Sequence, residues 1–371
     1  MTRKLLALAA LLGSTSVAHA GALDRTGQSI TVLFEEGRYA EFSLGAASPE
    51  VTGTAVNLGA PGFTGGSSGD MSPSYFQFGA AYKADIDDQW SYALIFDKPF
   101  GADVDYPTGT GYFAAGSTAE FNSYAITGIL RYKMPSNFSV YGGLRLQTIE
   151  AKANIPFVAG YSADGERDFG AGYLVGAAYE RPDIALRVSL TYNSKIKHSL
   201  DTTESSASPL GGPNTSQTEI DTPQSVNLEF QTGVAKDTLV FGGLRWTDWS
   251  EFDITPENYE TLTGGSLVSY NDDVYTWTLG VGRRLSETWS LAGSLGYERS
   301  NGGFFTNLGP TDGLASLTLA AIYSQDNYEI TTAIRYARIG DTQTRVGALA
   351  PAANFNDNDA IGLGIKIGYK F

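Results

Sequence analysis

A chain of 371 residues with 12% aromatic residues and 18% charged residues is too apolar to stay disordered. It has no cysteine, which excludes a disulfide framework and a thiolate metal site. Its formal net charge of −15 argues against nucleic-acid binding, which needs a basic face.

The first twenty residues are typical of a secretory signal peptide. Arg3 and Lys4 form a basic start, residues 5–12 form an apolar run, and residues 18–20 read Ala-His-Ala, a small-x-small cleavage site. We therefore expect residues 1–20 to be removed. The apolar run is too short to span a membrane, and no later stretch reaches 18 continuous apolar residues, so we expect no transmembrane helix.

The remaining chain alternates between apolar and polar residues with period two, which indicates β-strands. From Ile361 to Phe371 every odd-numbered residue is apolar or aromatic, and every even-numbered residue is glycine or lysine. A lipid-facing barrel strand requires this pattern, although a sandwich strand looks the same in isolation. The pattern predicts fourteen strands, at residues 39–54, 73–86, 89–106, 118–134, 137–154, 165–181, 183–200, 223–235, 237–253, 268–284, 287–299, 313–325, 327–340 and 358–371.

The length of each predicted connection depends on whether it follows an even-numbered or an odd-numbered strand. They are tight after each even-numbered strand, as in "DIDD" and "RLSE", and long and polar after each odd-numbered strand, as in residues 54–72 and 201–223. This sorting is typical of a bacterial outer-membrane barrel with periplasmic turns and extracellular loops, and a soluble sandwich has no reason for it. Four aromatic residues lie just inside the proposed periplasmic turns, where an interfacial belt belongs: Trp90, Phe138, Trp289 and Tyr328. The predicted class is an all-β, antiparallel transmembrane barrel over residues 39–371.

The third predicted strand contains a break, "KPFGA", at residues 98–102. Pro99 cannot donate a ladder hydrogen bond, and Gly101 lacks a side chain to pack. Apolar residues occupy even positions before the break (Tyr92, Leu94) and after it (Val104, Tyr106). The expectation is that the alternation keeps its phase and that Pro99, Phe100 and Gly101 form a kink inside a continuous strand.

Alternation places Arg145, Arg245 and Arg335 on the inner face, seven or eight residues above a periplasmic turn. That corresponds to roughly 16–19 Å, near the middle of the barrel. A guanidinium there suits bidentate binding of a carboxylate. The alternative is pairing with lumen acids such as Glu229, Glu298 or the N-terminal Asp24.

Apolar lining of a ligand path is expected from Leu33, Phe34 and Phe100 and from the loop aromatics Phe113 and Phe157, with simple loop packing as the alternative. Catalysis is disfavoured, because His198 is the one histidine outside the signal peptide and Ser199 beside it points to the opposite face. The acidic loop ends at residues 271–273 and 356–359 suit solvent or loosely held divalent ions, and we expect no metal site and no cofactor.

Several segments, taken in order, resemble the FadL family of outer-membrane transporters for long-chain fatty acids and other hydrophobic compounds. The likeness is carried by "SLGAASPEVTGT", "LTYNSKIKHSL", "DTPQSVNLEF", "TDWSEFDI" and "DVYTWTLGVGRRLSETWSLAGSLGYERS". It implies a fourteen-stranded barrel with an N-terminal hatch in its lumen. Here the hatch is the short segment of residues 21–38. It also implies that the kink in the third strand opens the barrel sideways to the membrane.

The expected function is passive uptake of hydrophobic molecules, most simply long-chain fatty acids, across the bacterial outer membrane. The ligand binds in steps and leaves laterally at the kink. The expected partners are that ligand and outer-membrane lipid or lipopolysaccharide, with no nucleic acid, and the barrel is expected to be a monomer. The alternatives are a general diffusion porin and, less favoured, a lipid hydrolase.

Overall fold

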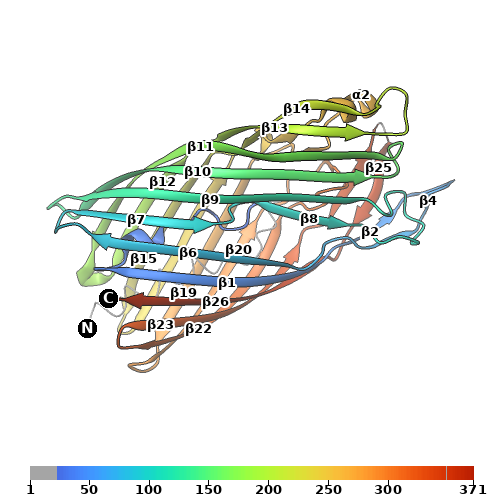
Figure 1. Cartoon of the computed structure of the whole chain (residues 1–371). Helices are drawn as coiled ribbons and strands as arrows, with labels where there is room; N and C mark the ends of the chain where they lie inside the picture. Colours follow the sequence, from blue (N-terminus) through green and yellow to red (C-terminus); the bar gives the residue numbers. More distant parts are fainter. Residues whose placement is uncertain (1–22, 348) are drawn as a thin grey trace.

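The computed structural model describes residues 23–347 and 349–371, so the proposed signal peptide lies outside the described residues. One antiparallel sheet closes into a barrel (Figure 1). Its strands are β1 (Tyr39–Glu50), β6 (Tyr75–Asp85), β7 (Trp90–Asp97), β8 (Gly101–Asp105), β9 (Thr118–Lys133), β10 (Phe138–Ile155), β11 (Tyr161–Arg181), β12 (Leu186–Asn193), β13 (Ile196–Ser205), β14 (Asn214–Thr222), β15 (Ser225–Ala235), β16 (Thr238–Thr247), β19 (Val274–Arg284), β20 (Trp289–Glu298), β22 (Leu314–Gln325), β23 (Tyr328–Ile339) and β26 (Asp359–Lys370).

These 17 strands make fourteen barrel strands, because three of the fourteen are interrupted once. The interrupted strands are β7 with β8, β12 with β13, and β14 with β15. The last strand closes on the first, with Tyr39 opposite Lys370, and β1 pairs with β6 on its other edge. The fourteen-stranded barrel predicted from the alternation is confirmed.

Two of the loops predicted to be long are shorter in the structure, so the prediction of their length is wrong. The strands that flank them continue above the membrane. β13 continues to Ser205 and β14 begins at Asn214, so most of the predicted loop at 201–223 is a β-hairpin. Along β13 every second residue is buried, including Thr202 and Glu204, so the inward face of the hairpin is packed. Likewise, β10 and β11 are joined by only residues 156–160. Loop length therefore does not follow parity at the fifth strand.

Side chains on the outer face are apolar and exposed, as a lipid-facing wall requires. Phe76, Leu144 and Phe169 are 80%, 72% and 76% exposed, whereas the inward Arg145, between Leu144 and Leu146, is 4% exposed. At the end with the short turns, aromatic side chains form neighbouring pairs, such as Trp90 with Tyr132 at 4.8 Å between ring centroids. The predicted belt residues Trp90, Phe138, Trp289 and Tyr328 are all exposed there.

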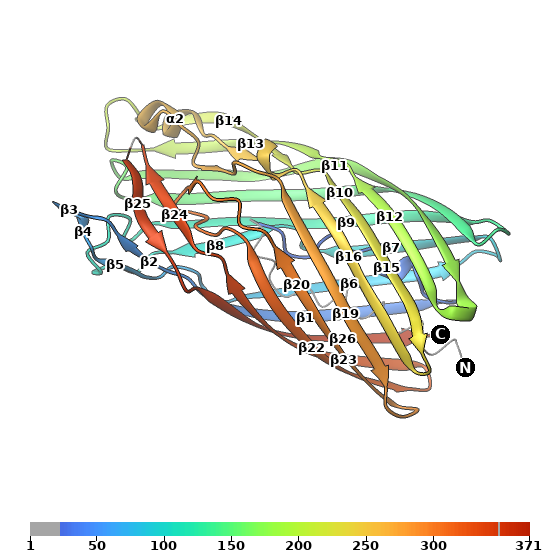
Figure 2. The same ribbon diagram turned by 180° about the vertical axis from the view of Figure 1, so that it is seen from behind.

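The strands outside the barrel lie at the opposite, extracellular end, where Figure 2 labels β2 to β5, β24 and β25. A five-stranded sheet joins segments from both ends of the chain, in the order β21-β24-β25-β2-β5. Its strands are β2 (Thr52–Ala55), β5 (Ser67–Asp70), β21 (Phe304–Phe305), β24 (Thr342–Val346) and β25 (Leu349–Phe355), and the smaller pairs are β3 (Asn57–Ala60) with β4 (Phe63–Thr64) and β17 (Asp253–Ile254) with β18 (Val268–Ser269).

The helices are short. They are α2 (Glu257–Thr263) and the 3₁₀ turns η1 (Thr31–Phe34), η2 (Pro182–Ile184) and η3 (Trp249–Glu251). Within the described residues, no helix combines the length and the hydropathy that a membrane span needs. The carboxylate of Glu204 accepts hydrogen bonds from the backbone N–H of Asn258 (3.1 Å) and Tyr259 (3.3 Å), which fixes the start of α2 to β13.

Candidate functional site: a break in the barrel wall and the cavities beside it

The third barrel strand loses one of its two neighbours halfway along. β7 pairs with β6 on one edge and with β9 on the other, but β8 pairs with β9 alone. The β6–β7 ladder ends at Ala80 opposite Phe96, so the remaining upper part of β6, residues 75–79, has a strand partner only on its β1 side. Figure 1 shows β7 and β8 as two separate arrows. The wall of the barrel therefore lacks a backbone ladder between β6 and β8.

The predicted phase across this break is wrong. Asp97 lies opposite Ala125 and Gly101 lies opposite Asn122, so four steps along the third strand match three steps along β9. This one extra residue reverses the faces, as in a β-bulge. Tyr92 and Leu94 are 39% and 51% exposed, whereas Val104 and Tyr106 are 6% and 0% exposed.

The extra residue is accommodated because Phe100 bonds to a side chain and not to the backbone of β9. The Phe100 N–H donates to Ser123 Oγ at 2.8 Å, and Ser123 Oγ donates back to the Phe100 carbonyl at 2.7 Å. The strand does continue along β9 after the break, as predicted. Its even-numbered apolar residues, however, face the lumen there.

The N-terminal segment, defined here as residues 23–38, supplies backbone partners at the break. The Arg25 N–H donates to the Pro99 carbonyl at 2.8 Å, and the Gly101 N–H donates to the Leu23 carbonyl at 2.9 Å. Between these bonds, Asp24 and Phe100 form an antiparallel bridge. Two polar backbone groups at the break, the Pro99 carbonyl and the Gly101 N–H, are thus satisfied from inside the barrel.

The same segment also binds the opposite wall through Arg245 of β16. Arg245 Nη2 lies 2.7 Å from the Asp24 carboxylate, and both side chains are less than 10% exposed. The Arg245 guanidinium also donates to Ser225, Asn227 and Gln28. Residues 24–28 therefore cross the lumen from β8 to β16. The predicted alternative for Arg245, pairing with Asp24, is what the structure shows.

The other two predicted arginines lie in different surroundings. Arg145 is buried and donates to Thr127 Oγ1 at 2.9 Å and to Asn193 Oδ1 at 3.2 Å. Arg335 donates to Ser316 Oγ at 3.0 Å. Arg245 and Arg335 both line a cavity of about 1160 Å³, with polar and apolar side chains, between the N-terminal segment and the β15–β22 wall. The three predicted arginines thus face the lumen, and each donates to polar side chains of the wall.

Leu33 and Phe34, both in η1, lie toward the periplasmic end. Leu33 is fully buried in a cluster with inward residues of the wall. The Phe34 ring lies between two guanidinium groups, with Arg131 at 4.7 Å and Arg187 at 4.5 Å from its centroid. Phe34 therefore lines the polar periplasmic mouth.

The predicted aromatic residues on the extracellular side form two groups. Phe100 is 1% exposed and packs edge-on against Trp249, with the ring centroids 5.8 Å apart. Phe113 stacks on Phe63 at 4.7 Å and contacts Phe157 edge-on at 5.5 Å. Phe63, Phe113 and Phe157 are only partly buried, and they form a patch, called here the loop aromatic patch.

Two adjoining cavities lie above the crossing segment. The first, of about 610 Å³, is walled mainly by aliphatic side chains, among them Leu200, Ile220 and Ile254. The second, of about 770 Å³, lies beside the wall break. Both are lined by Leu23, Ala102, Val104 and Leu308. We call them the inner apolar cavity and the break cavity.

The residues of these cavities were mostly missed by sequence reasoning. Arg25 and Tyr75 line the break cavity together with Tyr270, a loop residue whose phenol pKa is raised by burial. Inward alternation on β13 and β14 could have identified Leu200 and Ile220. No local signal identifies Arg25, because its contacts lie 50 or more residues away in the chain.

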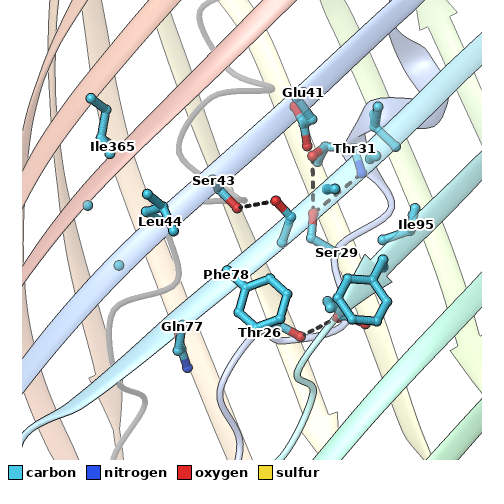
Figure 3. Close-up of a pocket in the computed structure, with 18 residues that line it drawn as sticks. Thr26, Ser29, Thr31, Glu41, Ser43, Leu44, Gln77, Phe78, Ile95 and Ile365 are labelled. Carbon is cyan, nitrogen blue, oxygen red and sulfur yellow. Dashed lines mark hydrogen bonds between the residues drawn. The ribbon is translucent and has the colours of Figure 1, made fainter.

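A third cavity, of about 700 Å³, lies below the break against β1, β6 and β7 (Figure 3). The N-terminal segment lines it with three hydroxyl side chains, Thr26, Ser29 and Thr31, and with Val32. Thr26 donates to Asp97, the last residue of β7, at 2.7 Å. We call this space the lower cavity.

His198, the histidine that the hydrolase alternative would need, points away from the neighbouring Ser199. His198 Nδ1 lies 3.1 Å from Asp168 inside the barrel, whereas Ser199 Oγ donates to Gln217 on the exposed side. The two side chains face opposite sides of the wall, as predicted. A serine–histidine pair of the kind that hydrolases use is therefore not assembled here.

A closed fourteen-stranded barrel with an apolar outer wall, and with its own N-terminal segment across the lumen, defines an outer-membrane transport channel. The model of the family described as outer membrane protein transport protein (OMPP1/FadL/TodX) matches residues 37–302. The chain belongs to this FadL/TodX family, whose members are outer-membrane transporters of hydrophobic compounds.

Solved structures show the same fold. A Pseudomonas aeruginosa FadL homologue superposes with a TM-score of 0.73 at 14% identity, covering 92% of each chain. The P. putida toluene transporter TodX gives 0.65 at 13% identity, also covering 92% of each chain. The Ralstonia pickettii toluene transporter TbuX gives 0.62 at 14% identity, covering 92% of this chain and 91% of that one. A comparison with curated protein sequences found no match.

Proposed function

We propose that the chain is a passive uptake channel for hydrophobic molecules, most simply long-chain fatty acids, and that it releases them sideways at the break between β7 and β8. The observation that carries the proposal is the missing ladder between β6 and β8, with the break cavity and the inner apolar cavity inside it. An outer-membrane barrel has no direct energy source, so movement follows the ligand's concentration gradient.

The path has three stages in this proposal. The loop aromatic patch (Phe63, Phe113 and Phe157) captures the ligand at the cell surface. The inner apolar cavity, walled mainly by aliphatic side chains, then takes the hydrocarbon out of water. Finally, displacement of the N-terminal segment from the break lets the ligand pass between β6 and β8. We propose that this segment is the hatch and that the barrel works as a monomer among lipopolysaccharide molecules.

A neutral aromatic hydrocarbon is the second candidate substrate. Aliphatic side chains and few charges line the inner apolar cavity, and its one cationic side chain is the exposed, acid-paired Lys152. None of the predicted arginines lines that cavity. Such a site favours hydrocarbons with or without a carboxylate, and two of the similar solved structures are toluene transporters.

Uptake into cells that lack their own copy of the gene tests the proposal. Cells expressing the chain should take up radiolabelled oleate faster than cells with an empty plasmid, and a parallel measurement with toluene separates the two substrate classes. A purified barrel with large, stable ion conductance and no co-purified hydrophobic molecule would instead support the general diffusion porin.

A further inference from the structure

Arg25 occupies the gap that the missing β6–β8 ladder leaves. Its Nε donates to the Gly101 carbonyl of β8 at 2.8 Å. On the other side, its guanidinium carbon lies 3.4 Å from the centroid of the Tyr75 ring of β6, a close cation–π contact. Arg25 is 8% exposed. One side chain therefore bridges the two strand edges that no backbone hydrogen bond joins.

The same side chain stands between two cavities. Arg25 and Tyr75 line the break cavity, and their neighbours Thr26 and Gln77 line the lower cavity. Since Tyr75 and Gln77 are two residues apart, they lie on one face of β6. A ligand that moves from the break cavity toward the lower cavity must pass the layer formed by Arg25 and Tyr75.

The acidic partner of Arg25 is held loosely. Arg25 Nη2 lies 3.6 Å from Asp103 Oδ2, and the Asp103 side chain is 28% exposed. A charge-assisted, bidentate guanidinium–carboxylate pair has contacts of about 2.7–2.9 Å. By contrast, Arg245 has a carboxylate at 2.7 Å and three further partners. The carboxylate beside Arg25 can therefore be exchanged at lower cost.

Arg25 is also the buried cationic side chain that lines the break cavity, which adjoins the inner apolar cavity. Arg25 and Lys152 are the cationic residues that line the inner apolar cavity and the break cavity, and Lys152 is 56% exposed at its side chain and paired with Asp164. A ligand with its tail in the inner apolar cavity and its head in the break cavity brings a carboxylate to Arg25, because the two cavities adjoin.

We infer that Arg25 is a carboxylate-responsive latch: it closes the gap between β6 and β8, and the head group of a fatty acid opens it by replacing Asp103. The ion pair between Arg25 and the ligand carboxylate draws the guanidinium away from Tyr75. The gap between β6 and β8 then opens beside the bound tail. A ligand shifts such an equilibrium only by its differential affinity for the open state, and the carboxylate supplies that difference. The inference rests on the proposed function, since it names the residue that makes the side exit selective for acids.

Uptake of laurate and 1-dodecanol into vesicles containing the purified barrel tests the latch, because the two ligands share a twelve-carbon chain and differ in charge. We expect the wild-type barrel to favour laurate by about tenfold, which corresponds to about 1.4 kcal/mol. Arg25→Gln should raise dodecanol uptake and bring the ratio close to one. Arg299→Gln, a change at an exposed loop arginine, should leave the ratio as in the wild type.

Asp103→Asn provides a second test of the latch, in which Arg25 itself is unchanged. Removing the competing carboxylate should lower the half-saturation concentration for laurate by about three- to tenfold and leave that for dodecanol unchanged. The latch is overturned if Arg25→Gln alters both ligands alike, or if Asp103→Asn leaves laurate uptake as it was. If the wild-type barrel moves neither ligand faster than vesicles without protein, the proposed function fails and the latch falls with it.

Discussion

Replacing Asp24 by alanine should release the N-terminal segment from the wall of the barrel. The change leaves the Arg245 guanidinium buried without its carboxylate, although Ser225, Asn227 and Gln28 still accept from it. Breaking a buried ion pair by removing one partner costs about 3–5 kcal/mol. Because three hydrogen-bond partners remain for Arg245, we expect a cost of about 3 kcal/mol here. Since about 1.4 kcal/mol is tenfold, the undocked fraction of the segment should rise about a hundredfold.

Single-channel recording in planar bilayers measures this fraction directly, because an undocked segment lets ions through the lumen. Asp24→Ala should raise the open probability by about a hundredfold, and Asp24→Asn, which keeps the size and one acceptor, by about tenfold. The double change Asp24→Leu with Arg245→Met should return conductance toward the wild-type level, because an apolar pair leaves no buried charge. A wild-type open probability in Asp24→Ala would refute the tether.

Three further outcomes are expected. Straightening the third strand with Pro99→Val and Gly101→Ala should impair uptake of oleate while the barrel still assembles, and unchanged uptake would remove the lateral exit. Gly280→Ala places a Cβ against the ring of Phe241 and 2.9 Å from a backbone oxygen, so it should lower the free energy of unfolding measured in urea by about 1–3 kcal/mol, whereas Gly128→Ala, with open space around it, should not. Glu204→Ala should expose α2 and its loop to protease, because two helix N–H groups lose their acceptor; equal cleavage of both proteins would contradict this.

Most of the barrel could be predicted from the sequence because lipid enforces one rule along every strand: every second side chain faces the membrane and must be apolar. The apolar residues from Ile361 to Phe371 had to face out, and the same rule fixed the count and direction of the strands. It placed Arg145 inside correctly, since Leu144 and Leu146 on either side are exposed. Where the strands rise above the membrane the rule ends, which is why the hairpin of β13 and β14 looked like a loop.

The break was located correctly and oriented wrongly for one reason. Val104 and Tyr106 are apolar like Tyr92 and Leu94, and apolarity alone does not say whether a residue meets lipid or a buried lumen. Only the pairing with β9, together with the bond from Phe100 to Ser123, reveals the extra residue. Arg25 escaped prediction for a related reason: its partners come from two distant segments, β6 and the third strand.

The inserted residue at the break separates the third strand into two halves whose side-chain orientations are independent. In an ordinary barrel strand, gaining or losing one residue would turn every later side chain to the opposite face. Here the segment from Lys98 to Phe100 has already absorbed such a change. Side chains of the upper half can therefore change to suit the ligand while the lower half keeps its apolar residues facing the lipid. Alignments of relatives that forbid a gap at this point would superpose outward residues of one protein on inward residues of another.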